Sequence, residues 1–185
     1  FAFAADPAFD GKSLAGWVVE GARTYKDAGK DLPVWVAEDG MIRCRASGGF
    51  GFLRYDKKHG DFALKLEYRF EKGKKAGNSG VGIRTVPFDP KRSTDTRPSI
   101  AAYEIQLVDD AGKKPDRHST GSLYRYVAPT ENAAKPAPEW NEREVECVGP
   151  RIKITLNGKK VRDVDQSKTS AIKNKPLEGF ISLQC

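Results

Sequence analysis

The chain has 185 residues, of which 38% are hydrophobic and 31% charged, a composition typical of one globular domain with room for a substantial core. No apolar run approaches the roughly 18 residues that a membrane-spanning helix needs. The net charge of +7 does not indicate nucleic-acid binding. Lysine pairs such as Lys57-Lys58 and Lys113-Lys114 fall at predicted turns, and no basic stripe is interleaved with aromatic residues.

The first residues, Phe1 to Asp6, resemble the tail of a secretory signal, an apolar remnant that ends in small residues. We therefore expect residues 1–8 to form an N-terminal arm, residues 9–185 to form a single domain, and the protein to be exported to the periplasm or the cell exterior. Cys44, Cys147 and Cys185 all lie in strand-like runs, where buried thiols are expected. One disulfide is the alternative, and the spacing does not place its partners.

Short runs of alternating polarity, separated by 18 glycines and 11 prolines, predict an all-β sandwich or barrel. The clearest alternation lies at 61–70, and Asn157-Gly158 predicts a tight hairpin that returns through Val161. We expect strands at 34–37, 41–45, 51–54, 61–70, 79–85, 103–108, 122–126, 143–148, 151–156 and 179–185. Residues 86–99 and 127–140 are predicted to be long loops, which are often functional.

Polar side chains share one face of two predicted strands. In the strand at 103–108, Glu104 and Gln106 point to one side and the apolar residues to the other. In the segment 77–84, Arg84 is expected on the same side as two glycines, Gly80 and Gly82. The two strands would present a carboxylate, an amide and a guanidinium over a floor cleared by glycines, which is a plausible small-molecule site.

An ordered series of short motifs covers nearly the whole chain. It resembles the 3-keto-disaccharide hydrolase domain family of bacterial exported proteins. The resemblance rests on Phe9-Asp10-Gly11-Lys12, Leu14, Gly16-Trp17, Trp35, Asp39-Gly40, Gly60-Asp61-Phe62, Asn78-Ser79-Gly80-Val81 with Arg84, Tyr103-Glu104-Ile105-Gln106 with Asp109, Thr120-Gly121-Ser122-Leu123-Tyr124, Glu139-Trp140-Asn141, Leu156-Asn157-Gly158 and Ile181-Ser182-Leu183-Gln184. It implies a concanavalin A-like jelly-roll sandwich of two antiparallel sheets and action on sugars whose C3 hydroxyl is a ketone. It also implies a further strand after Gln184, so we expect a C-terminal strand to be missing from a chain that ends at Cys185.

The implied chemistry begins with the ketone, which acidifies the hydrogen on C2. A general base removes that proton, the C1 substituent departs by β-elimination, and water adds to the product, so that the net reaction is hydrolysis. Glu104 is the candidate base, Arg84 would stabilise the enolate, and Asp109 is a second carboxylate. His118, in a loop, is a further candidate acid or base. No cofactor is assigned with certainty; a divalent cation such as Ca²⁺ or Mg²⁺, held by Glu104 and Asp109, stays open.

The expected ligand is a carbohydrate, and the candidate sugar-binding residues are amides and aromatic rings. They are Gln106, Asn78, Tyr124, Trp140, Asn141 and Gln184. A non-catalytic carbohydrate-binding module on the same fold is the alternative, since binding needs no carboxylate with a shifted pKa. Arg84 and Glu104 would then be a cross-strand ion pair on a solvated sheet. A glycosidase with two carboxylates on one face is disfavoured, because Glu104 and Gln106 supply only one.

Overall fold

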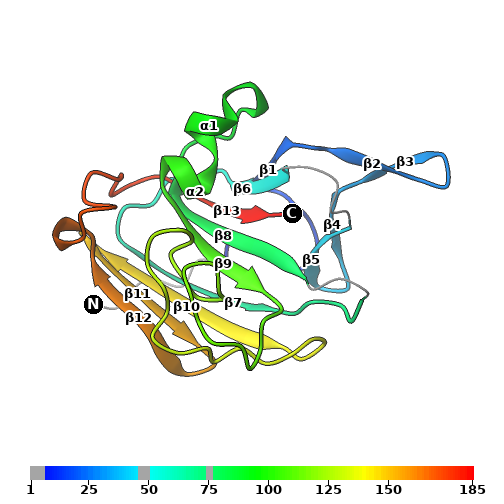
Figure 1. Cartoon of the computed structure of the whole chain (residues 1–185). Coiled ribbons are helices and arrows are strands. Elements are labelled where there is room, and N and C mark those ends of the chain that lie inside the picture. The colour runs from blue at the N-terminus through cyan, green and yellow to red at the C-terminus, as the bar shows by residue number, and fades with distance from the viewer. Residues whose placement is uncertain (1–6, 46–50, 74–76) are drawn as a thin grey trace.

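The computed structural model describes residues 7–45, 51–73 and 77–185, and two antiparallel sheets lie face to face in it (Figure 1). The five-stranded sheet has the order β1 (Trp17–Gly21), β6 (Gly51–Tyr55), β13 (Phe180–Gln184), β8 (Asn78–Thr85) and β9 (Tyr103–Val108). The four-stranded sheet has the order β12 (Lys159–Asp165), β11 (Arg151–Leu156), β10 (Asn141–Val148) and β7 (Phe62–Tyr68). The predicted all-β sandwich is confirmed.

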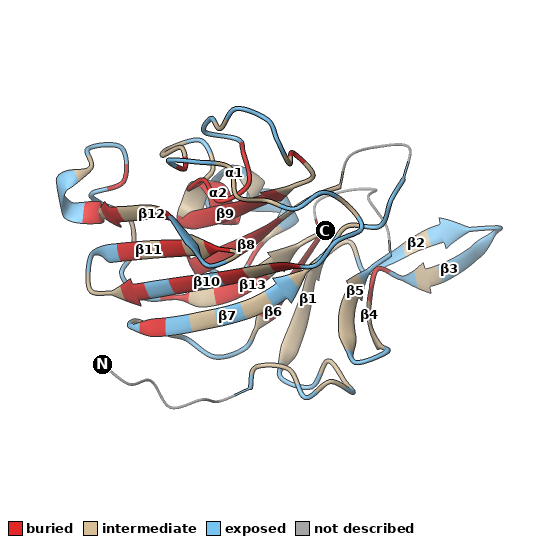
Figure 2. Cartoon of the chain, turned by 90° about the horizontal axis from the view of Figure 1, so that it is seen from below, coloured by how far each residue is buried: buried red, intermediate tan, exposed pale blue. Residues whose placement is uncertain are grey.

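Alternating side chains form the core between the two sheets. In β11, Ile152, Ile154 and Leu156 are fully buried while the residues between them are not. Val81 of β8 pairs with Ile105 of β9, and both are buried on the inner face. Figure 2 shows this alternation as red bands along the strands of the sandwich. The alternation with period two therefore defines which face of each strand packs in the core and which face is available to bind a ligand.

The turn after β11 follows its sequence signal. Asn157 and Gly158 both have positive φ angles, 50° and 77°, as a two-residue hairpin turn with right-handed strand twist requires. The chain then returns as β12, in which Val161 is buried.

Two small hairpins precede the second strand of the large sheet. They are formed by β2 (Thr24–Asp27) with β3 (Lys30–Pro33) and by β4 (Trp35–Glu38) with β5 (Met41–Cys44). The β2–β3 hairpin projects away from the sandwich and is largely exposed (Figures 1 and 2). The sequence did not predict β1, β2 or β3. The residues of β1 are all half-buried, and those of β2 and β3 are mostly polar and exposed, so none of the three strands has a clear alternation.

The segment between β8 and β9, expected to be a loop, contains three short helical turns. These are η1 (Pro90–Arg92), α1 (Ser93–Thr96) and α2 (Pro98–Ala101); a further turn, η2 (Gln166–Lys168), follows β12. α1 and α2 lie over the five-stranded sheet on the side away from the four-stranded sheet (Figure 1). They therefore cover part of the outer face on which the polar residues were predicted.

Cys44 and Cys185 form a disulfide, with their Cα atoms 5.8 Å apart, within the usual range for such a bond. The expectation of buried thiols was therefore wrong for these two residues, and the spacing along the sequence could not have paired residues 141 positions apart. Cys147 is a free thiol and fully buried in the core, as predicted.

Within the described part of the chain, no helix combines the length and apolar character needed to cross a membrane. Residues 1–6 of the predicted N-terminal arm lie outside the described residues.

Candidate functional site

The outer face of the five-stranded sheet carries a row of polar residues above two glycines. Gly82 of β8 lies opposite Glu104 of β9, and Gly80 lies opposite Gln106. Because their neighbours Val81 and Ile105 face the core, these four residues face outward. β13 extends the row, since Ser182 pairs with Gly82 on one side and with Arg54 of β6 on the other.

Glu104 is nearly buried, with 3% of its surface exposed. Its carboxyl group lies directly above Gly80: a Cβ atom there would come within 2.7 Å of Glu104 Cγ and 2.9 Å of Oε1. Burial raises the pKa of Glu104 from its ordinary 4.5 to about 7, although the charges of Arg97 and Arg125 and a hydrogen bond with Ser99 act in the opposite direction. A carboxyl group with a pKa near neutrality is suited to proton transfer at physiological pH.

An amide pair extends the polar face beside Glu104. Gln106 Nε2 lies 2.9 Å from Asn78 Oδ1, and with the Gln106 amide turned over its nitrogen is 3.2 Å from Glu104 Oε1. Gln106 is buried whereas Asn78 is exposed. Gln184 lies on the same face, because its register partner is Phe52 and the intervening residue Leu183 faces the core. The structure therefore brings these three predicted sugar-binding residues onto the face that carries Glu104.

A segment from the next loop pairs with the free edge of β9. Tyr124 N donates to Glu104 O at 2.8 Å, and Gly121 N donates to Gln106 O at 2.9 Å. Leu123 forms a bridge with Ile105 on the core side, so Tyr124 points to the same face as Glu104. The predicted strand at 122–126 is thus a short paired segment that turns away at Arg125.

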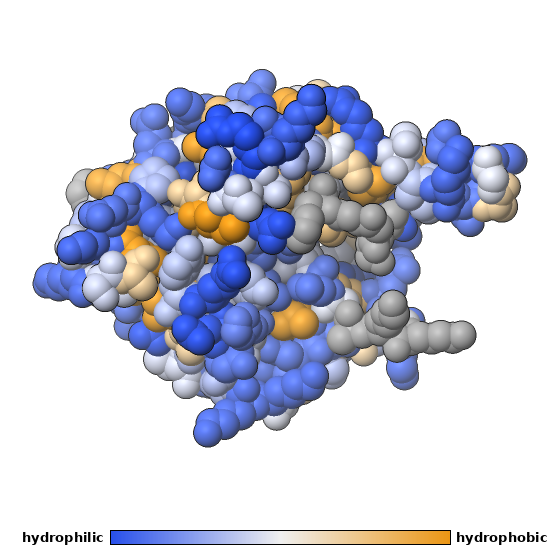
Figure 3. Space-filling view, turned by 45° about the horizontal axis from the view of Figure 1, so that its top comes forward, coloured by the Kyte–Doolittle hydropathy of each residue, from blue (hydrophilic) through white to orange (hydrophobic). Residues whose placement is uncertain are grey.

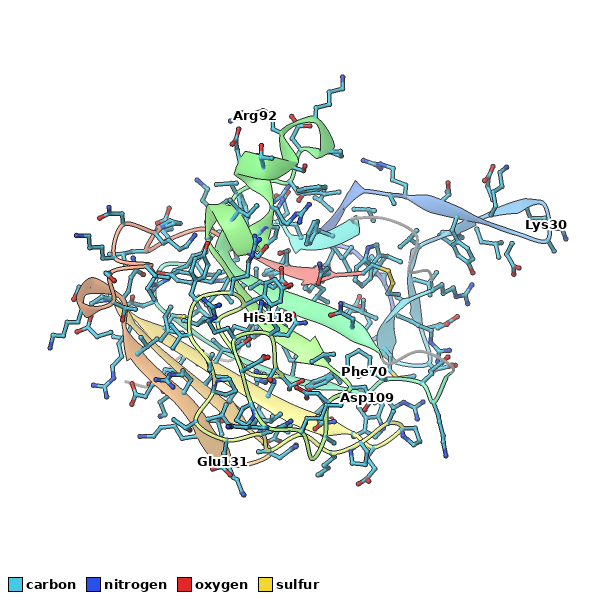
Figure 4. All side chains as sticks on the ribbon, in the orientation of Figure 1. Lys30, Phe70, Arg92, Asp109, His118 and Glu131 are labelled. Atoms are coloured by element: carbon cyan, nitrogen blue, oxygen red, sulfur yellow. A yellow bond between two sulfur atoms is a disulfide. The ribbon has the colours of Figure 1, made fainter. Side chains whose placement is uncertain are left out.

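His118 adds an imidazole to this group. Its ring lies edge-on to the ring of Tyr124, with centroids 5.3 Å apart, and it is exposed to solvent. Figure 4 shows His118 over the middle of the sheet, whereas Asp109 lies near the far end of β9. Glu104, Gln106, Tyr124 and His118 therefore form the centre of the candidate site.

Arg84 was expected on this face and does not lie there. It is fully buried, and its Nη2 atom donates to the carbonyl oxygens of Gly149 at 2.7 Å and Gly60 at 3.3 Å. The reason is local: Arg84 has a φ angle of 55°, where the pairing of β8 with β13 shifts register, and the shift breaks the alternation on which the prediction depended. Its charge acts instead on the core-facing groups of Tyr103 and Cys147.

Asp109 does not share a site with Glu104 either. Five positions along an extended chain, at about 3.3 Å each, place the two residues about 16 Å apart. Asp109 Oδ1 accepts a hydrogen bond from Ala137 N at 3.2 Å, in the loop before β10. A cation held jointly by Glu104 and Asp109, which the sequence left open, does not fit this separation, and no group of three or more potential metal ligands occurs among the residues that the structure describes.

Trp140 and Asn141 belong to the other sheet. Trp140 directly precedes β10 and is exposed, and the guanidinium of Arg69 lies over its ring, 5.0 Å from the centroid. Asn141 is buried; its Oδ1 accepts from Lys135 N at 2.8 Å and from Asn157 Nδ2 at 2.9 Å, and its Nδ2 donates to two loop carbonyls. These bonds join the loop before β10 to the β11–β12 hairpin, so the Asn141 side chain has a structural role.

We therefore expect Asn141→Ala to lower the free energy of unfolding by about 1–3 kcal/mol, because it leaves buried polar groups unpaired. Sugar affinity should not change. Urea denaturation and a binding titration measure the two effects. Asn174→Ala, which removes the same side chain from an exposed position, is the matched control and should change stability by less than about 0.5 kcal/mol. A loss of sugar binding in folded Asn141→Ala would restore Asn141 to the site.

Sequence reasoning missed the charged and polar groups that surround Glu104 from the loops. Ser99 lies in α2, Arg97 directly precedes α2, and Arg125 comes from the segment paired with β9. It also missed a buried ion pair, in which Arg54 Nε lies 2.5 Å from Glu20 Oε1. The second oxygen of Glu20 accepts from Phe88 N at 2.8 Å, which anchors the start of the segment that carries α1 and α2. The sequence could have predicted this ion pair only if β1 had been recognised as a strand beside β6.

Comparison with protein families identifies the domain. The model of the 3-keto-alpha-glucoside-1,2-lyase-like domain matches residues 4–185. The chain belongs to this family. The resemblance expected from the sequence motifs is thereby confirmed, and the polar face around Glu104 is part of a 3-keto-alpha-glucoside-1,2-lyase-like domain.

Solved structures show the same architecture. A presumptive glycosyl hydrolase of Parabacteroides distasonis is 27% identical, with a TM-score of 0.67 over 82% of this chain and 81% of that one. A second from the same organism is 24% identical, with a TM-score of 0.70 over 95% and 85%. The carbohydrate-binding module CBM66 of Bacillus subtilis, 17% identical, has a TM-score of 0.56 over 92% and 87%. No curated protein matches. The concanavalin A-like jelly-roll fold is therefore confirmed.

Proposed function

We propose that this domain cleaves 3-keto-glycosides, with Glu104 as the general base. The observation that carries the proposal is a buried carboxyl group over Gly80 whose pKa is raised to about 7. Family membership and the likeness to presumptive glycosyl hydrolases support the same class of reaction. Hydrophilic residues dominate the surface on the side of α1 and α2, and its hydrophobic patches are small, which suits a sugar (Figure 3).

The proposed reaction begins when Glu104 takes the proton from C2 of the sugar. The electron pair of that C–H bond forms the enolate of the C3 ketone, and its collapse expels the C1 substituent with the C1–O bonding pair. Water then adds at C1 of the resulting enone, and C2 regains a proton, so the sum is hydrolysis. A base that is half ionised near pH 7 combines an available lone pair with a strong tendency to accept the proton.

The surrounding residues have separate tasks in this proposal. The positive charge of Arg97 stabilises the enolate oxygen. Gln106, Asn78 and Gln184 bind sugar hydroxyl groups, and the ring of Tyr124 covers an apolar face of the pyranose. His118, exposed beside Tyr124, protonates the departing oxygen at C1.

The test is to incubate the purified domain with 4-nitrophenyl 3-keto-glucoside and with its unoxidised parent and to follow nitrophenol release. Release from the keto substrate alone is expected. Equal release from the parent would contradict the elimination and indicate an ordinary glycosidase. Saturable binding of either sugar without release would make the domain a carbohydrate-binding module.

Gly80→Ala should lower the rate of release from the keto substrate by about 100-fold, because the new methyl group displaces the Glu104 carboxyl from its position. Steady-state kinetics measure this effect. Gly60→Ala is the matched control, since its added methyl group would meet nothing closer than 3.9 Å, and it should keep most of the activity. Unchanged kinetics in Gly80→Ala would show that the observed position of Glu104 is not needed for the reaction.

We also propose that the protein is exported. The Cys44–Cys185 disulfide supports this, because disulfides persist mainly in oxidising compartments. Recovery of the oxidised protein from the periplasmic or secreted fraction is the expected result, and its confinement to the cytosolic fraction would contradict the proposal.

A further inference from the structure

Two exposed arginines lie together beside the candidate site. Arg125 N donates to Arg117 O at 2.9 Å, so the two residues are neighbours in space although eight positions apart. In the described part of the chain, neither guanidinium has a carboxylate within 4 Å. Among the exposed or half-exposed arginines of the described chain, Arg43, Arg92 and Arg151 do have a carboxylate within 4 Å, on Glu38, Asp95 and Asp163.

The acidic residue next in sequence does not neutralise this pair. Asp116 Oδ1 accepts from His118 N at 2.7 Å and from Ser119 Oγ at 3.2 Å, so this oxygen is engaged within its own turn. Lys113 and Lys114 add positive charge to the same loop. The segment 109–125 as a whole has a net charge of only +1, since it also contains Asp109 and Asp110. These two carboxylates accept hydrogen bonds from Ala137 N at 3.2 Å and Thr120 N at 3.0 Å, so they too are engaged away from Arg117 and Arg125.

The backbone fixes Arg125 close to Glu104. Tyr124 N donates to Glu104 O at 2.8 Å, and Arg125 is the next residue along the chain. The charge of Arg125 is near enough to lower the pKa of Glu104. Arg125 also has a φ angle of 73°, a left-handed conformation that is costly for a residue with a Cβ atom and that concentrates at ligand sites.

We propose that Arg125, with Arg117 beside it, binds a carboxylate group of the glycoside that occupies the Glu104 face. The substrate class is then an acidic 3-keto-glycoside, with its carboxylate either on the leaving group or at C6 of the sugar. A guanidinium pairs with a carboxylate through two parallel N–H···O bonds, which an uncharged amide cannot reproduce. The inference rests on the proposed function in one respect only, that this face binds a glycoside.

The test compares acidic substrates with neutral ones of nearly equal shape. One pair is the 3-keto-glucoside of 4-carboxyphenol and that of 4-carbamoylphenol; the other is a 3-keto-glucuronide and its amide. The readout is the ratio of kcat/KM for acid over amide, because this ratio cancels any change that a variant makes to Glu104 itself. The wild type should prefer the acid in at least one pair, and Arg125→Gln should reduce that preference about 10- to 100-fold.

Lys30→Gln is the matched control, since it removes the same charge from the tip of the distant β2–β3 hairpin (Figure 4). It should leave the ratio unchanged. Absence of a preference in both pairs, or its persistence in Arg125→Gln, would overturn the proposal. If no keto substrate reacts, the readout becomes the ratio of the binding constants of the unoxidised acid and amide, measured by titration. An Arg125-dependent preference would then support the carboxylate site while the proposed reaction fails, and its absence would overturn the site.

Discussion

Glu104→Gln is expected to lower the rate of release from a 3-keto-glucoside by about 10²- to 10⁴-fold, because an amide cannot accept the C2 proton. The side chain keeps its size, so its place above Gly80 and its contacts with Ser99 and Gln106 can persist. Binding of the unreactive parent sugar should therefore remain. The measurements are steady-state kinetics with the keto substrate and a binding titration with the parent.

The pH dependence of the reaction rate is an independent test of the role of Glu104. Only the carboxylate form of Glu104 can act as the base, and burial raises its pKa to about 7. The wild-type rate should therefore rise as pH rises through about 7. Glu67→Gln removes the same group from an exposed position on the other sheet and should keep both the rate and the profile. A wild-type rate in Glu104→Gln would remove Glu104 from the mechanism.

The raised pKa also makes a prediction about stability. Between pH 4.5 and about 7 the folded state holds a proton on Glu104 that the unfolded state releases, so the free energy of unfolding falls as pH rises through this window. The loss amounts to about 3 kcal/mol when complete. Glu104→Gln has no group that ionises at this position, so its free energy of unfolding does not fall in this window. The variant should therefore be more stable than the wild type at pH 8 but not at pH 4. Equal stability of the two proteins at pH 8 would mean that the carboxyl is not penalised by burial.

The part of the fold that could be predicted is the part with clear alternation. β9 and β11 occupy the predicted ranges, because buried apolar residues at every second position define both strands. β2 and β3 escaped prediction since they form an exposed hairpin with no core face to pattern. The pairing of β13 between β6 and β8 is a long-range choice, and local sequence carries no signal for it.

In the candidate site, too, the residues that could be predicted are those on strands with clear alternation. Glu104 and Gln106 were found because strand alternation is enough to place them on the outer face. Arg84 was misplaced because one left-handed residue at a register shift reverses the face, and an arginine gives no warning of it. Arg97 and Arg125 come from segments whose position depends on contacts with other elements, such as Tyr126 Oη donating to Ser99 O at 3.1 Å. Such contacts form only when the whole chain is folded.

Replacement of Cys44 and Cys185 by serine should lower the free energy of unfolding by about 2–5 kcal/mol. The disulfide joins β5 to the end of β13 across 141 positions, and long closed loops restrict the unfolded chain most. It also lies against the smaller hydrophobic cluster around Val34, Trp35 and Leu53, whose packing depends on both ends staying in place. For a chain of this length, the expected fall in Tm is about 5–15 °C. Thermal unfolding followed by circular dichroism measures it.

Chemical reduction of the Cys44–Cys185 disulfide is a control for this prediction that needs no mutation. Dithiothreitol should lower the Tm of the wild type to about that of the double variant and leave the variant unchanged, since Cys147 is a buried free thiol with nothing to reduce. A wild-type Tm that does not respond to the reductant would show that the Cys44–Cys185 bond carries no stability. Because β13 also places Ser182 and Gln184 on the candidate face, the reduced protein should lose sugar affinity at temperatures where the oxidised protein retains it. The central strand thus couples the covalent bond at its end to the site at its middle.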